Sequence, residues 1–390
     1  MADYEVNKSI SEINEKIKQG KAVVLNASEM ADLVRKEGKV EAAKQVDVVT
    51  TGTFSTMCSS GMLFNIGQEP PVMRTSKVWL NNVPAYAGIA AVDAYLGATE
   101  LAEDDPQNKV YPGRFSYGGG HVIEDLLKGK SVRLRAESYG TDCYPRREIE
   151  KDITLNDLPF AEMLNPRNCY QNYNVAVNLT SRTIYTYMGP LKPKGNNVNY
   201  ATAGELSPLF NDPLFKTIGM GTRIFLGGGV GYVIGAGTQH NPKPPRNERD
   251  VPLSPSGTLM VKGDMKQMDA RYVRGMSLIG YGTSVALGVG IPIPILNEEI
   301  ANYTGVSDAD IQLPIKDYGY DYPNGLPRVL GHVTYEELKS GTIKLDGNDT
   351  QAVPLTSLAM SLEVAEELKK WIQDGKFLLS EPVDDIPCQS

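Results

Sequence analysis

The residues that most often carry chemistry are scarce in this sequence. It contains four cysteines and three histidines among 390 residues. Four cysteines in a chain of this length do not make a disulfide scaffold. None belongs to a C-x-x-C pair, which excludes a local zinc, thioredoxin-type or iron–sulfur motif. We therefore expect reduced thiols in a cytoplasmic protein, with no cofactor or metal bound by a recognisable motif.

Positive charge and long apolar runs are lacking as well. The 39 basic residues against 47 acidic ones leave a net charge of −8, whereas a nucleic-acid binder needs a basic footprint. The longest apolar stretch, residues 284–296, contains Pro292 and Pro294 and is too short to span a membrane. The N-terminal residues contain no apolar core of a secretion signal. We expect no nucleic-acid or membrane partner, so that binding of an anionic substrate depends on a few local arginines.

Glycine, proline and tyrosine are what the sequence does contain. The 38 glycines and 25 prolines indicate many turns and ordered loops. The 20 tyrosines suit polar pockets built from loops, because the ring packs while the hydroxyl keeps a polar partner. Packing of loops without any site is the alternative for each of them.

Helix and strand patterns alternate along the chain. Ser9 with Glu12, and Thr334 with Glu337, form capping boxes that start helices. Periodicity predicts helices near residues 9–19, 28–36, 85–96 and 361–374, and strands near residues 22–25, 46–51, 132–136, 173–181, 223–226 and 257–262.

These patterns predict an α/β fold with mixed sheets, in one unit or in two subdomains, with an irregular α+β fold as the alternative. We expect one catalytic domain over residues 1–377, a charged, exposed proline-rich loop at 241–257 and a loose tail at 378–390.

A loop rich in Gly, Ser and Thr surrounds Cys58. It follows the strand pattern at residues 46–51. A helix beginning near Ser59 or Ser60 would aim free N–H groups at the thiol, and these groups stabilise a thiolate or bind an anion. A buried core thiol is the alternative. The neighbours are mostly hydroxyls and glycine, and both interpretations stay open.

A second polar loop holds Cys143, with Arg146 and Arg147 close behind it. A guanidinium group lowers a thiol pKa and can clamp a carboxylate. The adjacent Asp142 works against this if its carboxylate points at the sulfur. A structural loop cysteine is again the alternative.

The remaining cysteines and the histidines give weaker signals. Cys169 has little local chemistry, and Cys388 is interpreted as an incidental exposed thiol in the tail. His121 and His240 both follow glycine-rich turns, where each is a candidate general acid or base or a structural hydrogen-bonding residue. His332 precedes a predicted helix and is interpreted as a turn residue.

The glycine-rich residues 227–237 do not match a dinucleotide-binding motif. Their spacing is G-x-G-x-x-x-G rather than G-x-G-x-x-G, and no helix pattern follows. A Walker A lysine is missing too. The stretch is either a loop that passes close to a substrate or a set of tight β-turns.

Taken together, several segments resemble the homocysteine biosynthesis family, the L-aspartate semialdehyde sulfurtransferases of methanogenic archaea and some anaerobic bacteria. The segments are VDVVTTGTFSTMCSSG, KVWLNNVPAYAGIAAVDAYLGATE, GGGHVIEDLLKGKSVRLRAESYGTDCYPR and RIFLGGGVGYVIGAGTQHNP. The similarity extends over residues 9–377. Many relatives also carry a C-terminal pair of nucleotide-binding CBS domains, and we expect this sequence to lack that pair.

The resemblance implies an enzyme that places sulfur on the aldehyde carbon of L-aspartate semialdehyde, with reduction, to form L-homocysteine. It equates Cys58 and Cys143 with the family's two cysteines, of which at least one carries a persulfide. We favour Cys143 as the sulfur carrier and Cys58 as its partner in transfer or disulfide formation. His121 is the candidate proton donor to the aldehyde oxygen.

The remaining expectations concern the substrate and the partners. Candidate substrate-binding residues are Arg74, Arg146 and Arg147 for the carboxylate, Asp142 for the ammonium group, and Ser59 and Ser60 beside Cys58. The reaction needs a sulfide or persulfide donor and an external low-potential electron donor, which fits the small ferredoxin-like iron–sulfur protein that often accompanies family members. Assembly into a homo-oligomer is left open.

Two other functions compete with the sulfurtransferase. One is a non-catalytic persulfide carrier or scaffold that serves a separate enzyme. The other is an enzyme whose glycine loop binds a phosphate or nucleotide and whose cysteines are structural.

Overall fold

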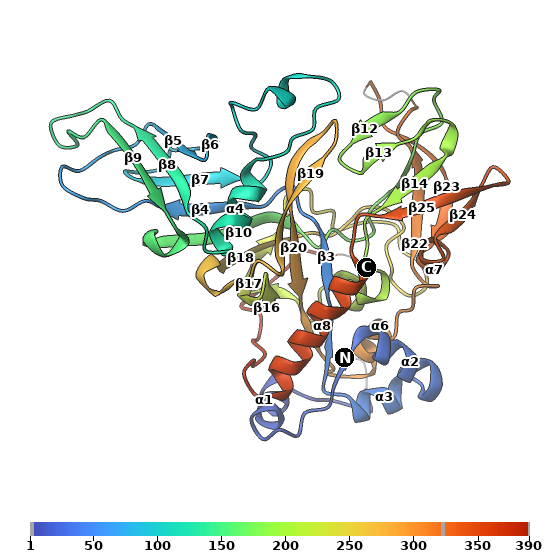
Figure 1. Ribbon diagram of the computed structural model, residues 1–390. Helices are drawn as coiled ribbons and strands as arrows, with labels where there is room; N and C mark the ends of the chain where they lie inside the picture. Colours follow the sequence, from blue (N-terminus) through green and yellow to red (C-terminus); the bar gives the residue numbers. More distant parts are fainter. Residues whose placement is uncertain (1–3, 321–323, 389–390) are drawn as a thin grey trace.

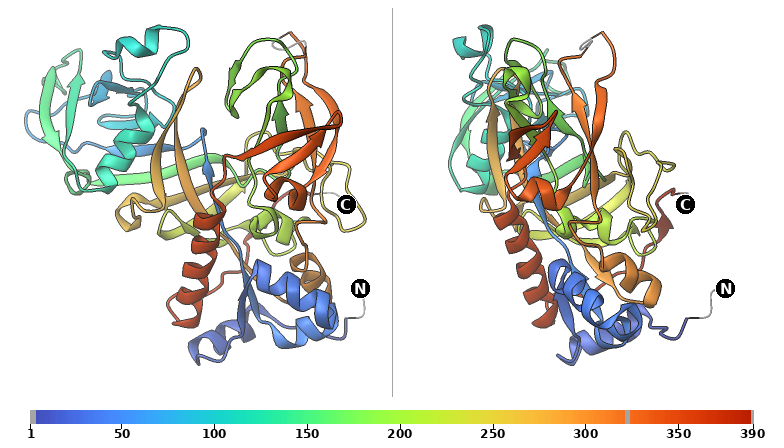
Figure 2. Two further views of the ribbon diagram at one scale, coloured as in Figure 1. Left: turned by 45° about the vertical axis from the view of Figure 1, so that its right-hand side comes forward. Right: turned by 90° about the vertical axis from the view of Figure 1, so that its right-hand side faces the viewer.

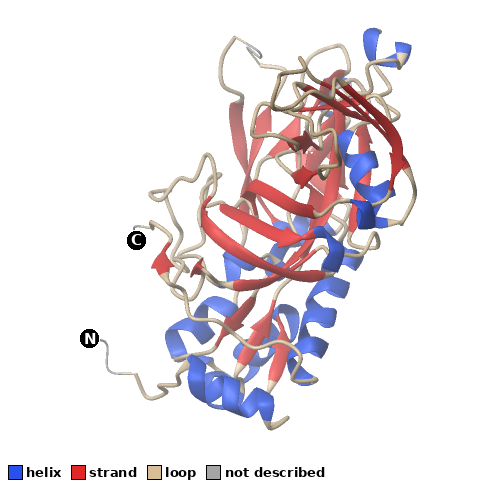
Figure 3. Ribbon diagram, turned by 90° about the vertical axis from the view of Figure 1, so that its left-hand side faces the viewer, coloured by secondary structure: helices blue, strands red, loops and turns tan. Residues whose placement is uncertain are grey.

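The computed structural model describes residues 4–320 and 324–388. Figure 1 shows the N-terminal helices gathered at one end, from which two strand-rich lobes extend. The two lobes are also apart in the left view of Figure 2. Figure 3 shows the same helical end beneath a body made mostly of strands.

The helical end is built around a small three-stranded sheet. Strand β1 (Val24–Asn26) runs parallel to β2 (Val48–Thr50), which pairs antiparallel with β21 (Pro292–Pro294). Ser9 closes a capping box at the start of the first helix, whose apolar face is buried. The helices around this sheet are α1 (Ile10–Lys18), α2 (Ala27–Glu37), α3 (Lys39–Gln45), α6 (Glu298–Thr304) and α8 (Leu358–Gln373).

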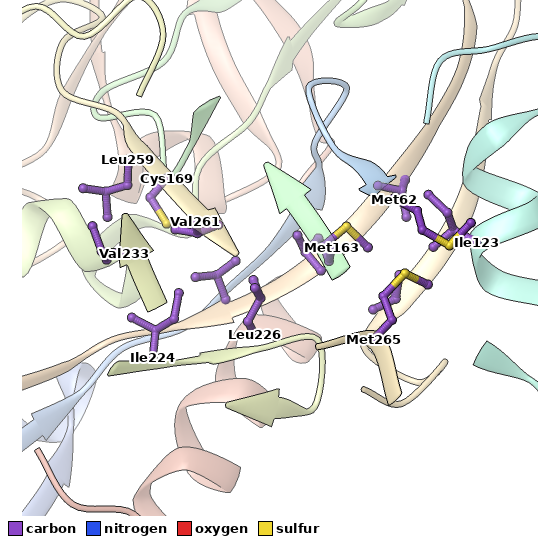
Figure 4. Close-up of a cluster of buried hydrophobic side chains, with 14 of the residues drawn as sticks. Met62, Ile123, Met163, Cys169, Ile224, Leu226, Val233, Leu259, Val261 and Met265 are labelled. Carbon is purple, nitrogen blue, oxygen red and sulfur yellow. The ribbon is translucent and has the colours of Figure 1, made fainter. Parts of the chain in front are cut away.

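A nine-stranded antiparallel sheet forms the centre of the molecule. Its order is β19-β20-β16-β17-β18-β10-β4-β7, and β3 pairs with β20 outside this path. The strands are β3 (Thr53–Thr56), β4 (Gly61–Asn65), β7 (Asp93–Gly97), β10 (Phe160–Asn168), β16 (Arg223–Leu226), β17 (Gly229–Ala236), β18 (Leu259–Asp264), β19 (Val273–Leu278) and β20 (Gly282–Gly290). Buried side chains such as Met62, Met163 and Leu226 pack on it (Figure 4).

The lobe built on a mixed six-stranded sheet is called the second lobe. The order of its strands is β23-β22-β11-β14-β25-β24. The pairs β11–β22 and β14–β25 are parallel and the others antiparallel. It has its own apolar cluster, which includes Val175 and Leu313. The strands are β11 (Val175–Val177), β14 (Asn197–Tyr200), β22 (Gln312–Asp317), β23 (Arg328–Thr334), β24 (Thr342–Leu345) and β25 (Asn348–Pro354), and helix α7 (Tyr335–Lys339) follows β23.

Smaller elements complete the lobes. The other lobe, called the first lobe, contains a four-stranded antiparallel sheet in the order β6-β5-β8-β9. In this lobe α4 (Gly119–Leu127) packs on β19. Its strands are β5 (Lys77–Leu80), β6 (Val83–Ala85), β8 (Val132–Glu137) and β9 (Glu148–Ile153). The others are β12 (Ile184–Thr186) paired with β13 (Gly189–Leu191), the short helix α5 (Pro208–Asn211), and β15 (Gly219–Met220) paired with β26 (Asp384–Asp385).

The α/β fold with mixed sheets is confirmed, as are the helices that begin with capping boxes at Ser9 and Thr334. The helix expected near residues 85–96 is wrong. That segment forms β6 and β7, and Tyr86 bridges Tyr95 across them. In β7 buried side chains alternate with partly exposed ones. This period of two is typical of a strand, whereas the helix prediction assumed a period of 3.6.

The tail is not loose over its described part. Residues 384–385 pair with β15, Ile386 is buried, and the backbone carbonyl of Pro387 lies 2.6 Å from a ring nitrogen of His240. Residues 389–390 lie outside the described residues. The proline-rich loop at 241–257 has no helix or strand, but Val251 and Ser256 within it are buried, so it packs against the body rather than standing free.

Candidate functional site

A cavity of about 350 Å³ lies where the central sheet meets the second lobe. The central sheet contributes the end of β3, the loop toward β4 and the end of β10. The second lobe contributes the β12–β13 turn and the segments that follow β14 and β25. The lining includes residues 53 and 55–59, 167, 169–171, 173, 187–188, 201–202, 207–210, 239, 281 and 355–356.

Cys58 lies in this lining, in the turn between β3 and β4. No helix follows it, so the expectation of helix N–H groups aimed at the thiol is wrong: Ser60 donates its N–H to the Met57 carbonyl, and the chain enters β4. Ser284 Oγ lies 3.3 Å from Cys58 Sγ as a hydrogen-bond donor. Burial raises the pKa of the Cys58 thiol, while the Ser284 bond and the nearby Arg167 charge oppose this increase.

Close packing fixes the strand that leads to Cys58. A Cβ at Gly52 would collide with the backbone of Ser361 and Ala365 in α8. Phe54 donates its N–H to Ser361 Oγ at 3.0 Å, and Ser357 donates its N–H to the Phe54 carbonyl at 2.9 Å. The longest helix of the described chain therefore holds β3, and through it the thiol loop, in place.

Arg167 is the only charged side chain that lines the cavity, as far as the described residues extend. It sits in a register shift between Asn165 and Asn168 at the end of β10, where β10 pairs with β18. A β-bulge of this kind redirects side chains locally. Across residues 4–320 and 324–388, no carboxylate forms an ion pair with Arg167, so its guanidinium is available to a ligand.

Tyrosines form one wall of the cavity. The rings of Tyr170 and Tyr173 are 5.0 Å apart, those of Tyr173 and Tyr187 are 6.1 Å apart, and those of Tyr187 and Tyr281 are 6.1 Å apart. Burial raises the pKa of Tyr170 and Tyr173, so both phenols stay neutral donors near pH 7. The wall offers ring faces and hydroxyls without negative charge.

Cys143 lies outside this cavity. Its loop joins β8 to β9 at the outer edge of the first lobe, and the residue is exposed, with Thr141 Oγ1 3.5 Å from its sulfur (Figure 1). Arg146 docks the loop by donating its N–H to the Val72 carbonyl and Nη2 to the Pro70 carbonyl. Residues 70–72 come after the C-terminal end of β4, and Cys58 comes before its N-terminal end. The strand is about 16 Å long. Cys143 therefore belongs to an exposed loop and not to the cavity lining that holds Cys58.

Some of the other predicted site residues lie at the cavity, and the rest lie on the surface of the first lobe. Ser59 lines the cavity, and Ser60 is buried below it and accepts a hydrogen bond from Asn165 Nδ2 at 2.7 Å. Arg74, Arg147 and Asp142 are exposed on the first lobe and do not line the cavity.

His121 is in the first turn of α4 and does not line the cavity either. Its ring stacks on Tyr117 at 5.6 Å, and Nε2 lies 3.3 Å from Ser277 Oγ. Burial lowers the pKa of the imidazole, which keeps it neutral at pH 7. His240 contacts two backbone carbonyls, those of Thr258 and Pro387, as a structural histidine does.

Two of the remaining motifs take their structural interpretations, whereas His332 lies in β23 and not in a turn. Cys169 lines the cavity as well, but it is 7% exposed, packs into the core of the central sheet (Figure 4), and burial raises its thiol pKa to about 12. Gly227 and Gly228, at positive φ, form the tight turn between β16 and β17, away from the cavity lining. Within the described chain, no group of three or more His, Cys, Asp or Glu side chains could hold a metal ion, and no helix is long and apolar enough to cross a membrane.

Arg167 was missed by the sequence interpretation. Its neighbours Asn168 and Cys169 carry little local chemistry, and only the β10–β18 register shift places its side chain beside Cys58. The one usable signal was its position two residues before Cys169, in a segment rich in amides and tyrosines.

Comparison with known proteins gives consistent matches. A family model described as "homocysteine biosynthesis enzyme, sulfur-incorporation" matches residues 22–379. The L-aspartate semialdehyde sulfurtransferase of Methanocaldococcus jannaschii is 51% identical over 394 residues, covering 98% of this chain and 74% of the relative. That of Methanosarcina acetivorans is 50% identical over 384 residues, covering 98% and 72%. No solved structure matches.

Proposed function

The chain belongs to the homocysteine biosynthesis enzyme family, and from this premise we propose that it acts as an L-aspartate semialdehyde sulfurtransferase with Cys58 as the sulfur-bearing nucleophile. The observation that carries the proposal is that Cys58 and the unpaired Arg167 line one tyrosine-walled cavity. A thiol that holds sulfur and a cation that holds a carboxylate are the two groups that this reaction requires.

Arg167 would bind the substrate carboxylate. A guanidinium group forms bidentate, charge-assisted hydrogen bonds with carboxylates, and this one has no protein carboxylate to compete among the described residues. The ammonium group of the substrate would lie against the tyrosine faces, because a desolvated cation over an aromatic ring is stabilised by about 2 kcal/mol. This arrangement replaces the earlier candidates Arg74, Arg146, Arg147 and Asp142, which lie outside the cavity.

The proposed reaction proceeds through a persulfide on Cys58. An external persulfide transfers its terminal sulfur to the Cys58 thiol and leaves as a thiol. The Cys58 persulfide then forms a C–S bond to the aldehyde carbon, giving a disulfide-linked hydroxy adduct. Cleavage of the S–S bond consumes two electrons and two protons. Replacement of the hydroxyl by hydrogen, with loss of water, consumes two more of each, and an external low-potential donor supplies all four electrons.

Cys143 would act at an earlier stage. Because it is exposed on the first lobe, it can meet a donor that is too large for the cavity. We assign it to receiving sulfur from such a donor. A small free thiol then takes the terminal sulfur from Cys143, enters the cavity as a persulfide and passes that sulfur to Cys58, leaving again as the thiol.

The test is homocysteine formation by the purified chain with L-aspartate semialdehyde, a small persulfide donor and a low-potential reductant. We expect Cys58→Ser to abolish the product, and Cys388→Ser, a matched change of a half-buried thiol elsewhere, to leave it intact. Full activity of Cys58→Ser would overturn the proposal. A persulfide on the wild-type chain without any homocysteine would instead indicate a non-catalytic carrier.

A further inference from the structure

The sulfur of Cys58 has a hydrogen-bond donor that does not belong to the cavity lining. Ser284 Oγ donates to Cys58 Sγ at 3.3 Å. Ser284 is 0% exposed and does not line the cavity, so it contacts the sulfur from within the protein and not from the space that a substrate would fill. Within residues 4–320 and 324–388 its hydroxyl has no other hydrogen-bond partner. A buried hydroxyl is costly unless it is hydrogen-bonded, and the sulfur is the atom that satisfies this one.

The register of the central sheet places these two side chains opposite each other. Strand β3 pairs antiparallel with β20. Met57 then donates its N–H to the Val285 carbonyl at 2.7 Å, which continues this pairing one residue beyond the end of β3. The next position of the same register brings Cys58 opposite Ser284. Directly opposed residues of an antiparallel pair have Cβ atoms about 4.5–5.5 Å apart on one face, so the sheet itself brings hydroxyl and sulfur together.

The backbone of Ser284 is also held from its other sides. Strand β19 pairs with β20 along its second edge, where Met276 lies opposite Ser284. Gly120 of α4 packs so closely on the Ser284 carbonyl that a Cβ at position 120 would collide with it. All nine residues of β20 are buried. The hydroxyl is therefore in place beside the sulfur before any substrate binds, and a donor held in this way costs no reorganisation during the reaction.

A donor held against a sulfur atom stabilises that atom most when the sulfur carries negative charge. In the proposed reaction the Cys58 sulfur carries this charge twice, when it attacks the incoming sulfur and when it leaves from an S–S bond. We propose that Ser284 is a catalytic residue whose hydroxyl stabilises the Cys58 thiolate at both of these steps. This inference rests on the proposed function.

Both steps balance with the reactants already named. In the first, the Cys58 thiolate forms a bond to the terminal sulfur of a small persulfide and the S–S bond of the donor breaks. The donor leaves as a thiol, with the proton that Cys58 released. In the second, the external reductant supplies two electrons to the S–S bond between Cys58 and the substrate sulfur. Each sulfur then keeps one electron pair and takes up one proton. A more stable thiolate leaves faster, so the same hydrogen bond assists this step as well.

Ser284→Ala tests the hydrogen bond, because it removes the hydroxyl and keeps the β-carbon. Loss of a hydrogen bond to a charged group lowers the thiolate population at least about 10-fold, and the higher nucleophilicity of a more basic thiolate offsets part of this loss. We expect the rate of persulfide loading of Cys58 from a small donor at pH 8 to fall about 4- to 15-fold, as followed by peptide mass spectrometry. Ser277→Ala is the matched control. It removes a hydroxyl of neighbouring β19 that donates to the Phe115 carbonyl, and it should load like wild type.

A second pair of variants separates the hydroxyl from the packing around it. Ser284→Thr and Ser284→Val add the same methyl group, and only threonine keeps a hydroxyl. The threonine variant should therefore load Cys58 faster than the valine variant. Loading of Ser284→Ala within twofold of wild type, or equal loading of the threonine and valine variants, overturns this inference while the role of Cys58 stands. An unloaded Cys58 in the wild-type chain, or an active Cys58→Ser variant, overturns the proposed function itself.

Discussion

At the scale of single residues, the proposed reaction depends on one thiol and one cation. Burial raises the Cys58 pKa, and the Arg167 charge works in the opposite direction. The thiol form therefore dominates at pH 7, and the reactive thiolate grows as the pH rises above the ordinary value for cysteine. This suits a site in which the persulfide rather than the free thiolate attacks carbon.

Alkylation of Cys58 tests these electrostatics. We expect the rate with iodoacetamide to keep rising above pH 9, because the pKa is raised. Arg167→Met removes the charge that favours the thiolate, so its rate at pH 8 should be lower than that of wild type. Peptide mass spectrometry measures both rates. An Arg167→Met rate equal to that of wild type across the pH range would place Arg167 too far from the sulfur to matter.

Arg167 also makes a prediction about substrate binding. Loss of a charge-assisted pair costs about 1.5–3 kcal/mol, so Arg167→Met should raise KM for L-aspartate semialdehyde roughly 10- to 100-fold. Arg147→Met changes an exposed arginine outside the cavity and should leave KM unchanged. A raised KM in Arg147→Met together with an unchanged KM in Arg167→Met would mean that the Cys143 loop, and not the cavity, binds the substrate carboxylate.

At the scale of elements, local patterns predicted those parts of the fold that local forces determine. The capping boxes at Ser9 and Thr334 start helices as expected, and the alternating residues 132–136 lie in β8. The turn after Cys58 and the direction of Arg167 depend on partners distant in sequence, β20 and β18. One sequence contains no signal for those pairings, so Cys58 was predicted as a site residue and Arg167 was not.

The packing of β3 on α8 gives a stability prediction. Gly52→Ala places a methyl group against the α8 backbone, and such overpacking costs about 1–3 kcal/mol. We expect a lower Tm by thermal unfolding and weaker homocysteine formation, since β3 carries the thiol loop. Gly97→Ala has room for its Cβ and should change neither. Equal Tm values for wild type and Gly52→Ala would show that this contact does not fix β3.

At the scale of the whole molecule, the cavity and the exposed thiol occupy different lobes. The cavity forms between the central sheet and the second lobe, whereas Cys143 lies at the outer edge of the first lobe. This arrangement predicts that the size of the sulfur donor determines whether Cys143 is needed. Cys143→Ser should stay active with a small persulfide and lose activity with a protein-bound persulfide, as measured by homocysteine yield. Equal loss with both donors would mean that Cys143 takes part in the carbon chemistry.

The most direct test of the central claim follows one sulfur atom through a single turnover. The chain is loaded with isotopically labelled persulfide, freed of donor, and mixed with L-aspartate semialdehyde and reductant. We expect the label on the Cys58 peptide before mixing, and we expect it to leave that peptide and to appear in homocysteine. Homocysteine that carries the label while the Cys58 peptide was never labelled would contradict the account.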